Sequence, residues 1–332
     1  MAKKKISIED VARRAGVSIT TVSRVINNVP TVSKTNRLKV EEAIRFFKFK
    51  PNISAQQLAK GESRAVGLII PRYEGVYSSF YAVEIIRGVG SSCEQLKLDL
   101  LLHLTDGREL LNVSNLGGVI FADIIENRQQ LESILEENIP CIVINNIIKD
   151  LPVNYLGIDN LKGAKTAVTY LVELGHKNIA TITGSLITQC AQQRLEGYKL
   201  ALKEKNVPLK EDYIEKGDFS RRSARVATLK LLDLTHPPTA IFVASDDMAQ
   251  EAIAVIMEKG LKVPKDISVI GFDDNPASLY GPVSLTTMRQ PLFSMAAQAV
   301  KELNAIMQGK KTTLKAILPT ELVIRESCSH FS

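Results

Sequence analysis

From Ala65 onward, short apolar runs alternate with longer segments of helical periodicity, and this alternation constrains the fold more than any other feature of the chain. Such runs are typical of buried parallel strands, and their alternation with helices is typical of doubly wound sheets. A first series of expected strands covers residues 66–70, 98–104, 119–121 and 141–144, and a second covers 155–158, 179–182, 213–216, 240–243 and 267–270. The sequence therefore predicts an α/β core of two doubly wound parallel-sheet lobes.

The segment before this core differs from it in charge. Residues 1–64 carry 14 Lys and Arg against 5 Asp and Glu, whereas the remainder carries 28 against 31. A basic head on a slightly acidic body predicts a polyanionic partner for the head alone. The alternative is an ordinary solvated, charged surface.

Within the head, capping residues and helical spacing predict three short helices. Ser7 and Asp10 have the spacing of a capping box, Ser18 and Ser33 are expected to cap the second and third helices, and Gly16 suits a sharp turn between the first two. The residues expected to face inward are Ile8, Val11, Ala12, Ala15, Val22, Val25, Ile26, Leu38, Val40, Ile44 and Phe47. Two helices around a tight turn, with a third as buttress, predict an all-α helix-turn-helix head rather than a generic three-helix bundle.

In a helix-turn-helix head the second helix lies in the major groove of DNA. The residues of this helix expected to contact DNA are Ser18, Ile19, Thr20, Thr21, Ser23, Arg24 and Asn27. Arg24 can bind guanine through two hydrogen bonds, and Thr20 can touch a base edge or a thymine methyl group. The other hydroxyl and amide side chains suit phosphate oxygens, which set the register without reading sequence.

A further short helix is expected after the head. Pro51 ends the preceding structure, Asn52 can cap the segment 53–60, and Gly61 ends it. Two helical turns are unstable alone, so this segment needs DNA or its twin in a dimer as a partner. The alternative is an inert linker.

Several of these stretches occur together in one family. They are Asp10-Val11-Ala12, Ala15-Gly16-Val17-Ser18, Thr21-Val22-Ser23-Arg24-Val25-Ile26-Asn27, Pro51-Asn52 and Ala55-Gln56-Gln57-Leu58-Ala59. In this combination the chain resembles the lactose/galactose repressor family of bacterial transcription regulators. The resemblance implies a homodimer that reads a palindromic double-stranded DNA operator. It also implies that the hinge helices contact the minor groove through Asn52, Ala55, Gln56 and Leu58, with Leu58 as a wedge in the central base step.

The resemblance also implies the division of the chain. The expected parts are a helix-turn-helix domain at 1–50, a hinge helix and linker at 51–64, an N-terminal sensor lobe at 65–158 with 290–318, and a C-terminal sensor lobe at 159–289 with 319–332. The two lobes would be of the periplasmic-binding-protein type. The ligand of such a core would be a small-molecule effector, a sugar or sugar derivative.

Ligands of doubly wound folds bind at the carboxyl ends of the strands. These ends nominate Arg72, Tyr73, Phe80, Tyr81, Asn145, Arg194, Phe219, Asp246 and Asp273 as effector contacts. By resemblance, Arg194 and Asp273 match the family's strongest effector contacts and Phe219 its stacking ring. Arg and Asp side chains can each bind vicinal hydroxyls twice. As alternatives, Arg194 could pair with Asp218, Asp273 could cap a helix, and Phe219 could belong to the core.

The expected function is a sequence-specific transcription regulator, a repressor of carbohydrate-metabolism genes, located in the cytoplasm with the nucleoid. No enzymatic activity, cofactor or metal site is expected, since the cysteines and histidines are scattered and no phosphate-binding loop or nucleophile elbow occurs. The alternatives are a corepressor-dependent regulator that responds to a small molecule or phosphoprotein, and a solute-binding protein without DNA binding. An enzyme with Asp246 or Asp273 in a carboxylate pair is a further rival.

One segment departs from the family's pattern. Residues 105–116 leave room for one short helix at most, over 106–113, where the family has a longer one. This segment borders the family's dimer face and the rim of its effector pocket, so the family's dimer contacts and effector geometry do not carry over directly to this chain. The C-terminus has no heptad tail, and coiled-coil tetramers are not expected.

Overall fold

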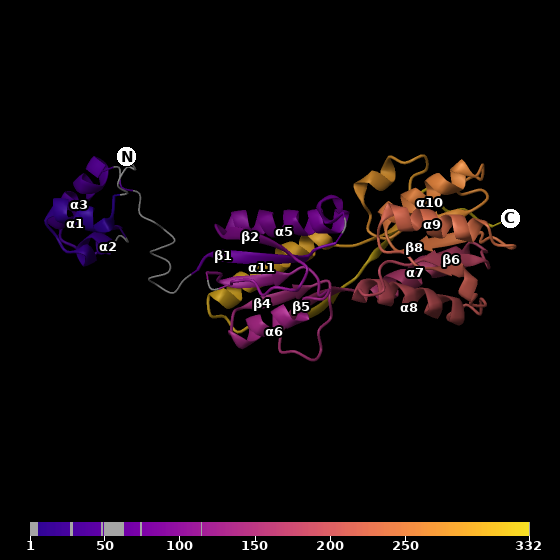
Figure 1. The fold of residues 1–332 in the computed structure, drawn as a ribbon, viewed down its shortest axis with the longest axis horizontal. Coiled ribbons are helices and arrows are strands. Elements are labelled where there is room, and N and C mark those ends of the chain that lie inside the picture. Colours follow the sequence, from indigo (N-terminus) through magenta and orange to yellow (C-terminus); the bar gives the residue numbers. More distant parts are fainter. Residues whose placement is uncertain are drawn as a thin grey trace. The chain divides into compact units, whose positions relative to one another are not determined.

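The computed structural model describes residues 6–26, 29–47, 49, 63–73, 75–113 and 115–331. The chain divides into two compact units, Met1–Ser63 and Arg64–Ser332. The described residues of the first unit form helices, and those of the second form sheets flanked by helices, as Figure 1 shows. The predicted fold class, a helix-turn-helix head with a two-lobed α/β core, is confirmed.

The head consists of α1 (Ile8–Ala15), α2 (Ile19–Ile26) and α3 (Lys34–Phe47). The predicted capping box starts α1: Ser7 Oγ accepts from the amide of Asp10, whose carboxylate accepts from the amide of Ser7 at 3.0 Å. Gly16 ends α1 in the left-handed region, at φ 62°, and its amide donates to the last carbonyls of the helix. Since side chains with a Cβ disfavour this region, glycine sets the tight turn into α2.

The core of the head differs from the prediction at one position. Its buried residues are Val11, Ala12, Ala15, Val22, Val25, Val40 and Ala43. Leu38, expected to face inward, is 58% exposed. Residues of a helix are about 100° apart, so a side chain two positions before the buried Val40 lies on the opposite face.

The first lobe of the core contains a six-stranded parallel sheet in the order β11-β5-β4-β3-β1-β2. Its elements are β1 (Ala65–Pro71), the 3-10 helix η1 (Val76–Ser78), α5 (Phe80–Leu96), β2 (Asp99–Thr105), β3 (Gly118–Phe121), α6 (Arg128–Glu136), β4 (Cys141–Ile144), β5 (Asn154–Ile158), α11 (Leu292–Met307) and β11 (Lys315–Leu318). β3 and β4 are wholly buried and β1 nearly so, which explains their uniformly apolar sequences, whereas the edge strand β2 is partly exposed.

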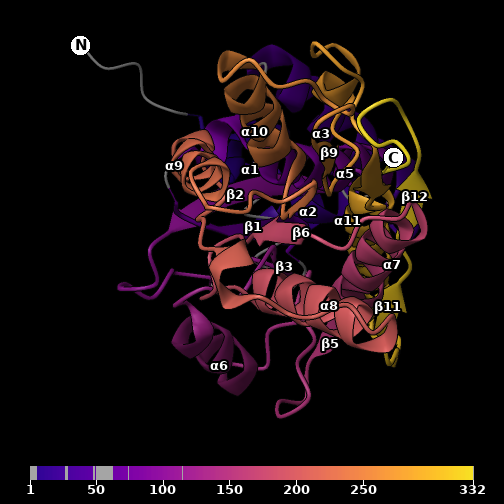
Figure 2. The same cartoon turned by 90° about the vertical axis from the view of Figure 1, so that its right-hand side faces the viewer.

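The second lobe contains a four-stranded parallel sheet in the order β7-β6-β8-β9. Its elements are α7 (Asn160–Glu173), β6 (Ile179–Ile182), α8 (Gln189–Glu204), η2 (Glu211–Tyr213), β7 (Ile214–Glu215), α9 (Arg221–Leu232), β8 (Ala240–Val243), α10 (Asp246–Glu258), β9 (Ser268–Ile270) and η3 (Pro276–Leu279). Figure 2 shows α7 and α8 on one side of this sheet and α9 and α10 on the other.

Each face of each sheet has its own apolar cluster. In the first lobe, α5 and α11 cover one face and α6 covers the other; in the second, α9 and α10 cover one face and α7 and α8 the other. Both sheets are therefore buried on both faces, as the apolar runs predicted.

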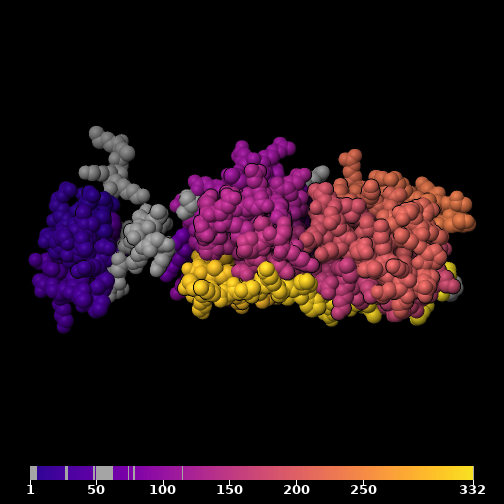
Figure 3. Space-filling model, turned by 90° about the horizontal axis from the view of Figure 1, so that it is seen from below, coloured from indigo at the N-terminus to yellow at the C-terminus, as the bar shows by residue number. Residues whose placement is uncertain are grey.

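Two antiparallel strands, β10 (Thr287–Arg289) and β12 (Glu321–Val323), lie where the chain passes between the lobes. β10 leads from the second lobe into α11 of the first, and β12 leads from β11 of the first lobe back to the second. Figure 3 shows the C-terminal segment, coloured yellow, along one side of both lobes. Each lobe is thus completed by residues from the C-terminal part of the chain.

The segment after β2 contains no helix among its described residues 106–113 and 115–117, so the short helix allowed for 106–113 is absent. Gly107 has a left-handed φ of 79°, and its amide donates to the side chain of Thr105, which turns the chain away from helical geometry. Val113 and Leu116 then bury themselves against the sheet face that α6 covers. Irregular chain with two buried apolar side chains therefore forms the described part of this segment.

Candidate functional site

The exposed face of α2 carries the predicted DNA contacts that the structure describes. Ser18, Ile19, Thr20 and Arg24 are exposed, and Thr21 and Ser23 are half-buried. Ser18 Oγ accepts from the amide of Thr21 at 3.1 Å and lies 2.9 Å from the hydroxyl of Thr21, so these two side chains cap the helix. Asn27 and the hinge residues Asn52, Ala55, Gln56 and Leu58 lie outside the described residues.

In the first lobe, an acidic and an amide side chain meet at the carboxyl ends of adjacent strands. Asp123 follows β3 and Asn145 follows β4, and the Asn145 side-chain amide donates to Asp123 Oδ2 at 3.0 Å. The other carboxylate oxygen accepts from the amide of Ile124 at 2.7 Å. Both side chains are buried, and Asn145 Oδ1 has no hydrogen-bond partner among the described residues.

In the second lobe, Arg194 projects from α8 toward the end of β9. Its Nε donates to Asn160 Oδ1 at 2.9 Å and its Nη1 to the carbonyl of Ala244 at 2.6 Å. Its guanidinium lies over the ring of Phe272, 3.8 Å from the ring centre, and Nη1 is 3.9 Å from Asp273 Oδ1. The predicted alternative, a pair with Asp218, is not formed. Among the described residues, Nη2 of Arg194 makes neither a hydrogen bond nor an ion pair.

Asp273 forms a second carboxylate–amide pair. Gln290, which directly follows β10, donates from Nε2 to Asp273 Oδ1 at 2.5 Å. The amide oxygen of Gln290 is buried and, among the residues that the structure describes, has no partner. Asp273 has a left-handed φ of 139°, which is strained for any residue with a Cβ. Its backbone bonds to Met288 and Gln290 hold it against β10.

Electrostatic interactions join these groups from the two lobes. Burial raises the pKa of Asp123 to about 6, while hydrogen bonds from Ile124 and Asn145 and the positive charge of Arg194 oppose that rise. Burial also raises the pKa of Asp273, against the effect of Arg194. Burial raises the pKa of Tyr73 as well, and the charges of Asp123 and Asp273 both add to this rise.

We call Asp123, Asn145, Arg194, Asp273 and Gln290 the acceptor-rich cluster. Near this cluster, the two lobes are joined by hydrogen bonds between Gln189, at the start of α8, and the backbone of Ile147. The side chain of Gln189 accepts from the amide of Ile147 at 2.7 Å and donates to its carbonyl at 3.1 Å. The cluster thus combines the buried carboxylate of Asp123, the half-buried carboxylate of Asp273, one guanidinium, and two buried amide oxygens without partners among the described residues.

The predicted aromatic contacts have different surroundings. Tyr81 donates its hydroxyl to the carbonyl of Ala122, next to Asp123, and Phe80 packs half-buried on the core of the first lobe. Phe219 has a left-handed φ of 72°, and its ring lies so close to Gly184 that a Cβ there would fall 2.1 Å from a ring carbon. Gly184, just beyond β6, therefore makes room for the ring.

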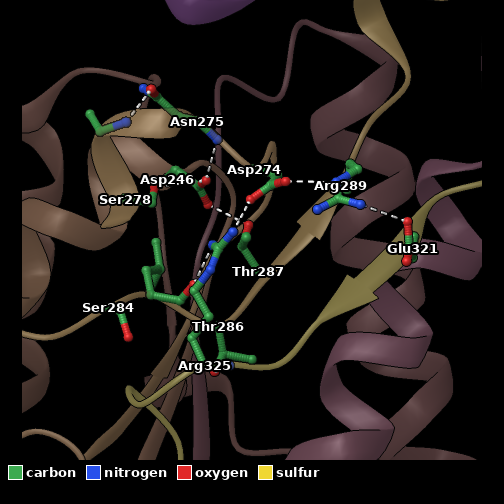
Figure 4. Close-up of polar contacts among 12 residues, drawn as sticks. Asp246, Asp274, Asn275, Ser278, Ser284, Thr286, Thr287, Arg289, Glu321 and Arg325 are labelled. Carbon is green, nitrogen blue, oxygen red and sulfur yellow. Dashed lines mark hydrogen bonds and ion pairs between the residues drawn. The ribbon is translucent and has the colours of Figure 1, made fainter. Parts of the chain in front are cut away.

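Two of the predicted effector contacts, Arg72 and Asp246, bind other groups of the protein. Arg72 is exposed, and its guanidinium donates to the carbonyl of Leu104 at 3.4 Å. Asp246 is fully buried and accepts from Thr287, Ser278 and the amide of Asn275, as Figure 4 shows. Its carboxylate ties the loop after β9 to β10. Its role in effector binding stays a prediction.

Figure 4 also shows an ionic network beside this carboxylate. Asp274 accepts from Arg325 at 2.5 Å and from Arg289 at 2.7 Å, and Arg289 also pairs with Glu321 at 3.0 Å. The network links the residue after Asp273 to both strands, β10 and β12, at which the chain passes between the lobes. The position of Asp273 is therefore coupled to the connections between the lobes.

The sequence prediction missed Asp123, Gln290 and Cys190. Asp123 stands two residues beyond β3, and its position at a strand end was the available signal. Gln290 carried no such signal, because only the bridge between Asp273 and Arg289, at the end of β10, brings it to Asp273. Cys190 is buried in α8, and its thiol pKa is raised by burial and also responds to Arg194 and Asp123.

The carboxylate pairs that suggested an enzyme have structural partners. Asp246 is bound by three donors, and Asp247 interacts with Asn275 at 3.3 Å and Arg221 at 3.6 Å. Over the described ranges, no group of three or more His, Cys, Asp or Glu side chains could hold a metal ion. Within the same ranges, no helix has the length and apolarity that crossing a membrane requires.

Comparison with known proteins places counterparts over almost the whole chain. Residues 7–52 match the lacI family of bacterial regulatory proteins, and residues 168–328 match the periplasmic binding protein-like domain. The probable HTH-type transcriptional repressor ExuR of Bacillus subtilis (strain 168) is 34% identical over 330 residues, which are 97% of this chain and 98% of the relative. The catabolite control protein A of Priestia megaterium is 34% identical over 97% of this chain and 99% of its own.

A solved structure of the Lac repressor dimer bound to operator and the anti-inducer ONPF matches with a TM-score of 0.84 at 29% identity. The match covers 98% of this chain and 100% of that one. The transcriptional regulator CelR in complex with cellobiose matches with a TM-score of 0.72 at 27% identity over 97% and 99%. Head and core are therefore found in the same order in these proteins.

Proposed function

We propose, since the chain belongs to the lacI family of bacterial regulatory proteins, that its head reads a palindromic operator as half of a homodimer and that a small molecule bound between the lobes controls this binding. Membership itself makes the protein a DNA-binding transcription regulator and not an enzyme. The observation that carries the proposal is the exposed face of α2 in a head that matches this family over residues 7–52.

In the proposed complex, α2 lies in the major groove. Arg24 contacts a guanine, Ile19 and Thr20 touch neighbouring base edges, and the hydroxyls of Ser18, Thr21 and Ser23, with Asn27, contact phosphates. The capping bond between Ser18 and Thr21 supports this assignment, because a helix N-terminus with exposed hydroxyls favours an anion.

The hinge residues Asn52, Ala55, Gln56 and Leu58 would contact the minor groove. In this proposal, Leu58 enters the central base step of the operator, and the cost of unstacking is offset by the contacts that the bend allows. The palindrome follows from the two-fold symmetry of a homodimer. The operator complex of the Lac repressor dimer, a structural match, supports this assembly.

Effector binding is assigned to Arg194, Asp273, Asn145, Tyr73 and Phe219 of the predicted set, with Asp123 and Gln290 added. Buried polar groups without partners and carboxylates with raised pKa values are typical of ligand sites. Arg72, Phe80, Tyr81 and Asp246 would then border the site, since each already has a partner or packs on the core.

We propose repression as the mode of control, with release by the effector. The names of the relatives in Bacillus subtilis and Escherichia coli, which are repressors, support this mode. A corepressor that tightens operator binding is the alternative. Because the target is genomic DNA, we also propose that the protein works in the cytoplasm, in association with the nucleoid.

The experiment that tests this function is selection of binding sites from random duplex DNA by the purified full-length protein at near-physiological salt. We expect enrichment of a two-fold symmetric site with a flexible central step. A variant that lacks residues 1–63 is the control and should enrich nothing. Enrichment of an asymmetric site, or of none by the folded full-length protein, would contradict operator reading by an effector-free dimer.

A further inference from the structure

We infer that the effector is a polyhydroxy molecule without a carboxylate or phosphate group, neutral or amine-bearing, and that Asp123 is the residue that selects it by charge. This inference rests on the effector site proposed above and specifies its ligand. The acceptor-rich cluster carries the argument through the hydrogen-bonding capacity that its own contacts leave unused.

Each carboxylate of the cluster is paired with an amide side chain, and this pairing orients the amide. The NH2 group of Asn145 donates to Asp123, and that of Gln290 donates to Asp273. The amide oxygens therefore point away from the carboxylates. Both oxygens are buried, and neither has a partner among the described residues. Two buried acceptors thus require donors that a ligand can supply.

Donors of the protein itself are scarce in this cluster. Arg194 is its one cation, and Nε and Nη1 are already bonded to Asn160 and to the carbonyl of Ala244. The second hydrogen of Nη1, which lies 3.9 Å from Asp273 Oδ1, and the two hydrogens of Nη2 remain for a ligand. Arg72 directly follows β1 and precedes Tyr73. Its guanidinium is exposed, and its Nη2 donates to the carbonyl of Leu104 at 3.4 Å. The Tyr81 hydroxyl is donated to the carbonyl of Ala122.

An acidic ligand would meet the buried carboxylate of Asp123, and Arg194, the one cation of the cluster, already donates to Asn160 and to the carbonyl of Ala244. Asp123 is buried to the same degree as the amides around it, and both it and Asp273 interact with Arg194. Like charges at low dielectric repel strongly, whereas hydroxyl and ammonium groups would each donate to the free oxygens. A polyhydroxy molecule satisfies all four acceptor side chains without adding negative charge.

Phe219 is consistent with such a ligand. Its ring is held over Gly184 in a strained backbone conformation and is half-buried. An aromatic face suits the C–H side of a sugar ring, and it offers no charge to an anionic group.

The test uses the full-length protein and the operator obtained by site selection. Its response is measured with matched sets of compounds: aldoses and polyols, the corresponding uronic acids and sugar phosphates, and the corresponding amino sugars. Operator affinity and isothermal titration calorimetry are the two readouts. We expect the responding compounds to come from the neutral or amino sets, with each acidic counterpart at least about 10- to 100-fold weaker, as for a lost or repelled bond to a charged group.

Two variants assign this preference to a residue. Asp123→Asn should weaken binding of the responding compound about 10- to 100-fold and reduce its advantage over the acidic counterpart. Asp150→Asn is the matched control, because Asp150 is an exposed acid of the same lobe that pairs with Arg128. This control should change neither affinity nor selectivity.

The outcomes separate this inference from the proposed function. A response that comes from an acidic compound, and that Arg194→Ala removes, would overturn the inference and leave effector control standing. Unchanged selectivity in Asp123→Asn would remove that residue as the determinant. Operator binding that no compound of any set alters would overturn both the inference and effector control by such molecules, while DNA reading would stand.

Discussion

The carboxylate of Asp123 should make the ligand-free core less stable, because the folded chain holds it away from water. Its pKa rises from 3.8 to about 6 on folding, chiefly through burial. A rise of this size corresponds to about 3 kcal/mol, since each tenfold change in proton affinity is worth about 1.4 kcal/mol. Asp123→Asn removes this charge and nearly preserves the shape of the side chain. One accepting oxygen becomes an NH2 group, toward which the amide of Asn145 can turn its own oxygen.

The sign of the effect depends on pH. Below pH 3.8 the side chain is protonated in both the folded and the unfolded chain, and the destabilisation is absent. It grows as the pH rises toward 6 and is complete above that value. The substitution should therefore raise the free energy of unfolding of the core by about 3 kcal/mol at pH 8, and by much less at pH 4.5.

Urea denaturation followed by far-ultraviolet circular dichroism at pH 8 and pH 4.5 measures this difference. Asp218→Asn is the control of opposite sign: burial alone would raise the pKa of Asp218, but hydrogen bonds from Ser220 and Ser223 hold it below its usual value. That variant should lose stability at pH 8. An Asp123→Asn variant that is equally or less stable than the natural chain at pH 8 would refute the reasoning.

Four further substitutions test the head, the hinge and the cluster. Arg24→Ala should cost about 1–3 kcal/mol in operator binding and relax the preference at one base of each half-site, measured by competition with mutated operators. Leu58→Ala should weaken specific binding more than non-specific binding; equal losses on both DNAs would speak against the wedge. Arg194→Ala should abolish the effector response at unchanged DNA affinity, and a normal response would remove it from the site. Gly16→Ala should destabilise the head by about 1 kcal/mol, seen in its thermal unfolding, because Gly16 adopts a φ of 62° and the space around it is open; no change in the midpoint would count against a strained turn.

Much of the fold could be predicted because its causes are local. β3 and β4 are wholly buried, so their apolar runs are continuous in the sequence. The caps at Ser7, Ser18 and Ser33 depend on residues two or three positions away, and all three form. Leu38 was expected inward with the other apolar residues of its helix, although the phase set by Val40 excludes it. The segment after Asp106 has no helix among its described residues, because the turn at Gly107 directly follows β2.

The candidate site shows where sequence reasoning loses its basis. Asp273 lies just beyond β9 and Arg194 in the second turn of α8, and both could be nominated from the pattern together with the family resemblance. Asp246 occupied an equally favourable position, but three donors from η3 and β10, and from the loop before η3, bind it. Whether a carboxylate at such a position is fully hydrogen-bonded within the protein or can still bind a ligand depends on how distant segments pack around it.

Gln290 illustrates the converse case and connects the site to the two lobes. It directly follows β10 and begins the segment 290–318 that was expected to join the first lobe, yet its amide completes the pair with Asp273 of the second lobe. Asp274, the next residue, is held by Arg289 and Arg325 from the connections at β10 and β12. A ligand that bonds to Asp273 and the free oxygen of Gln290 would therefore act on the segments that join the lobes, while Asp123 and Asn145 would bind it to the first lobe. Asp123 and Asp273 lie on the two sides of these connections, and both gain favourable partners only when the ligand is present. Ligand binding can therefore favour a different arrangement of the two lobes.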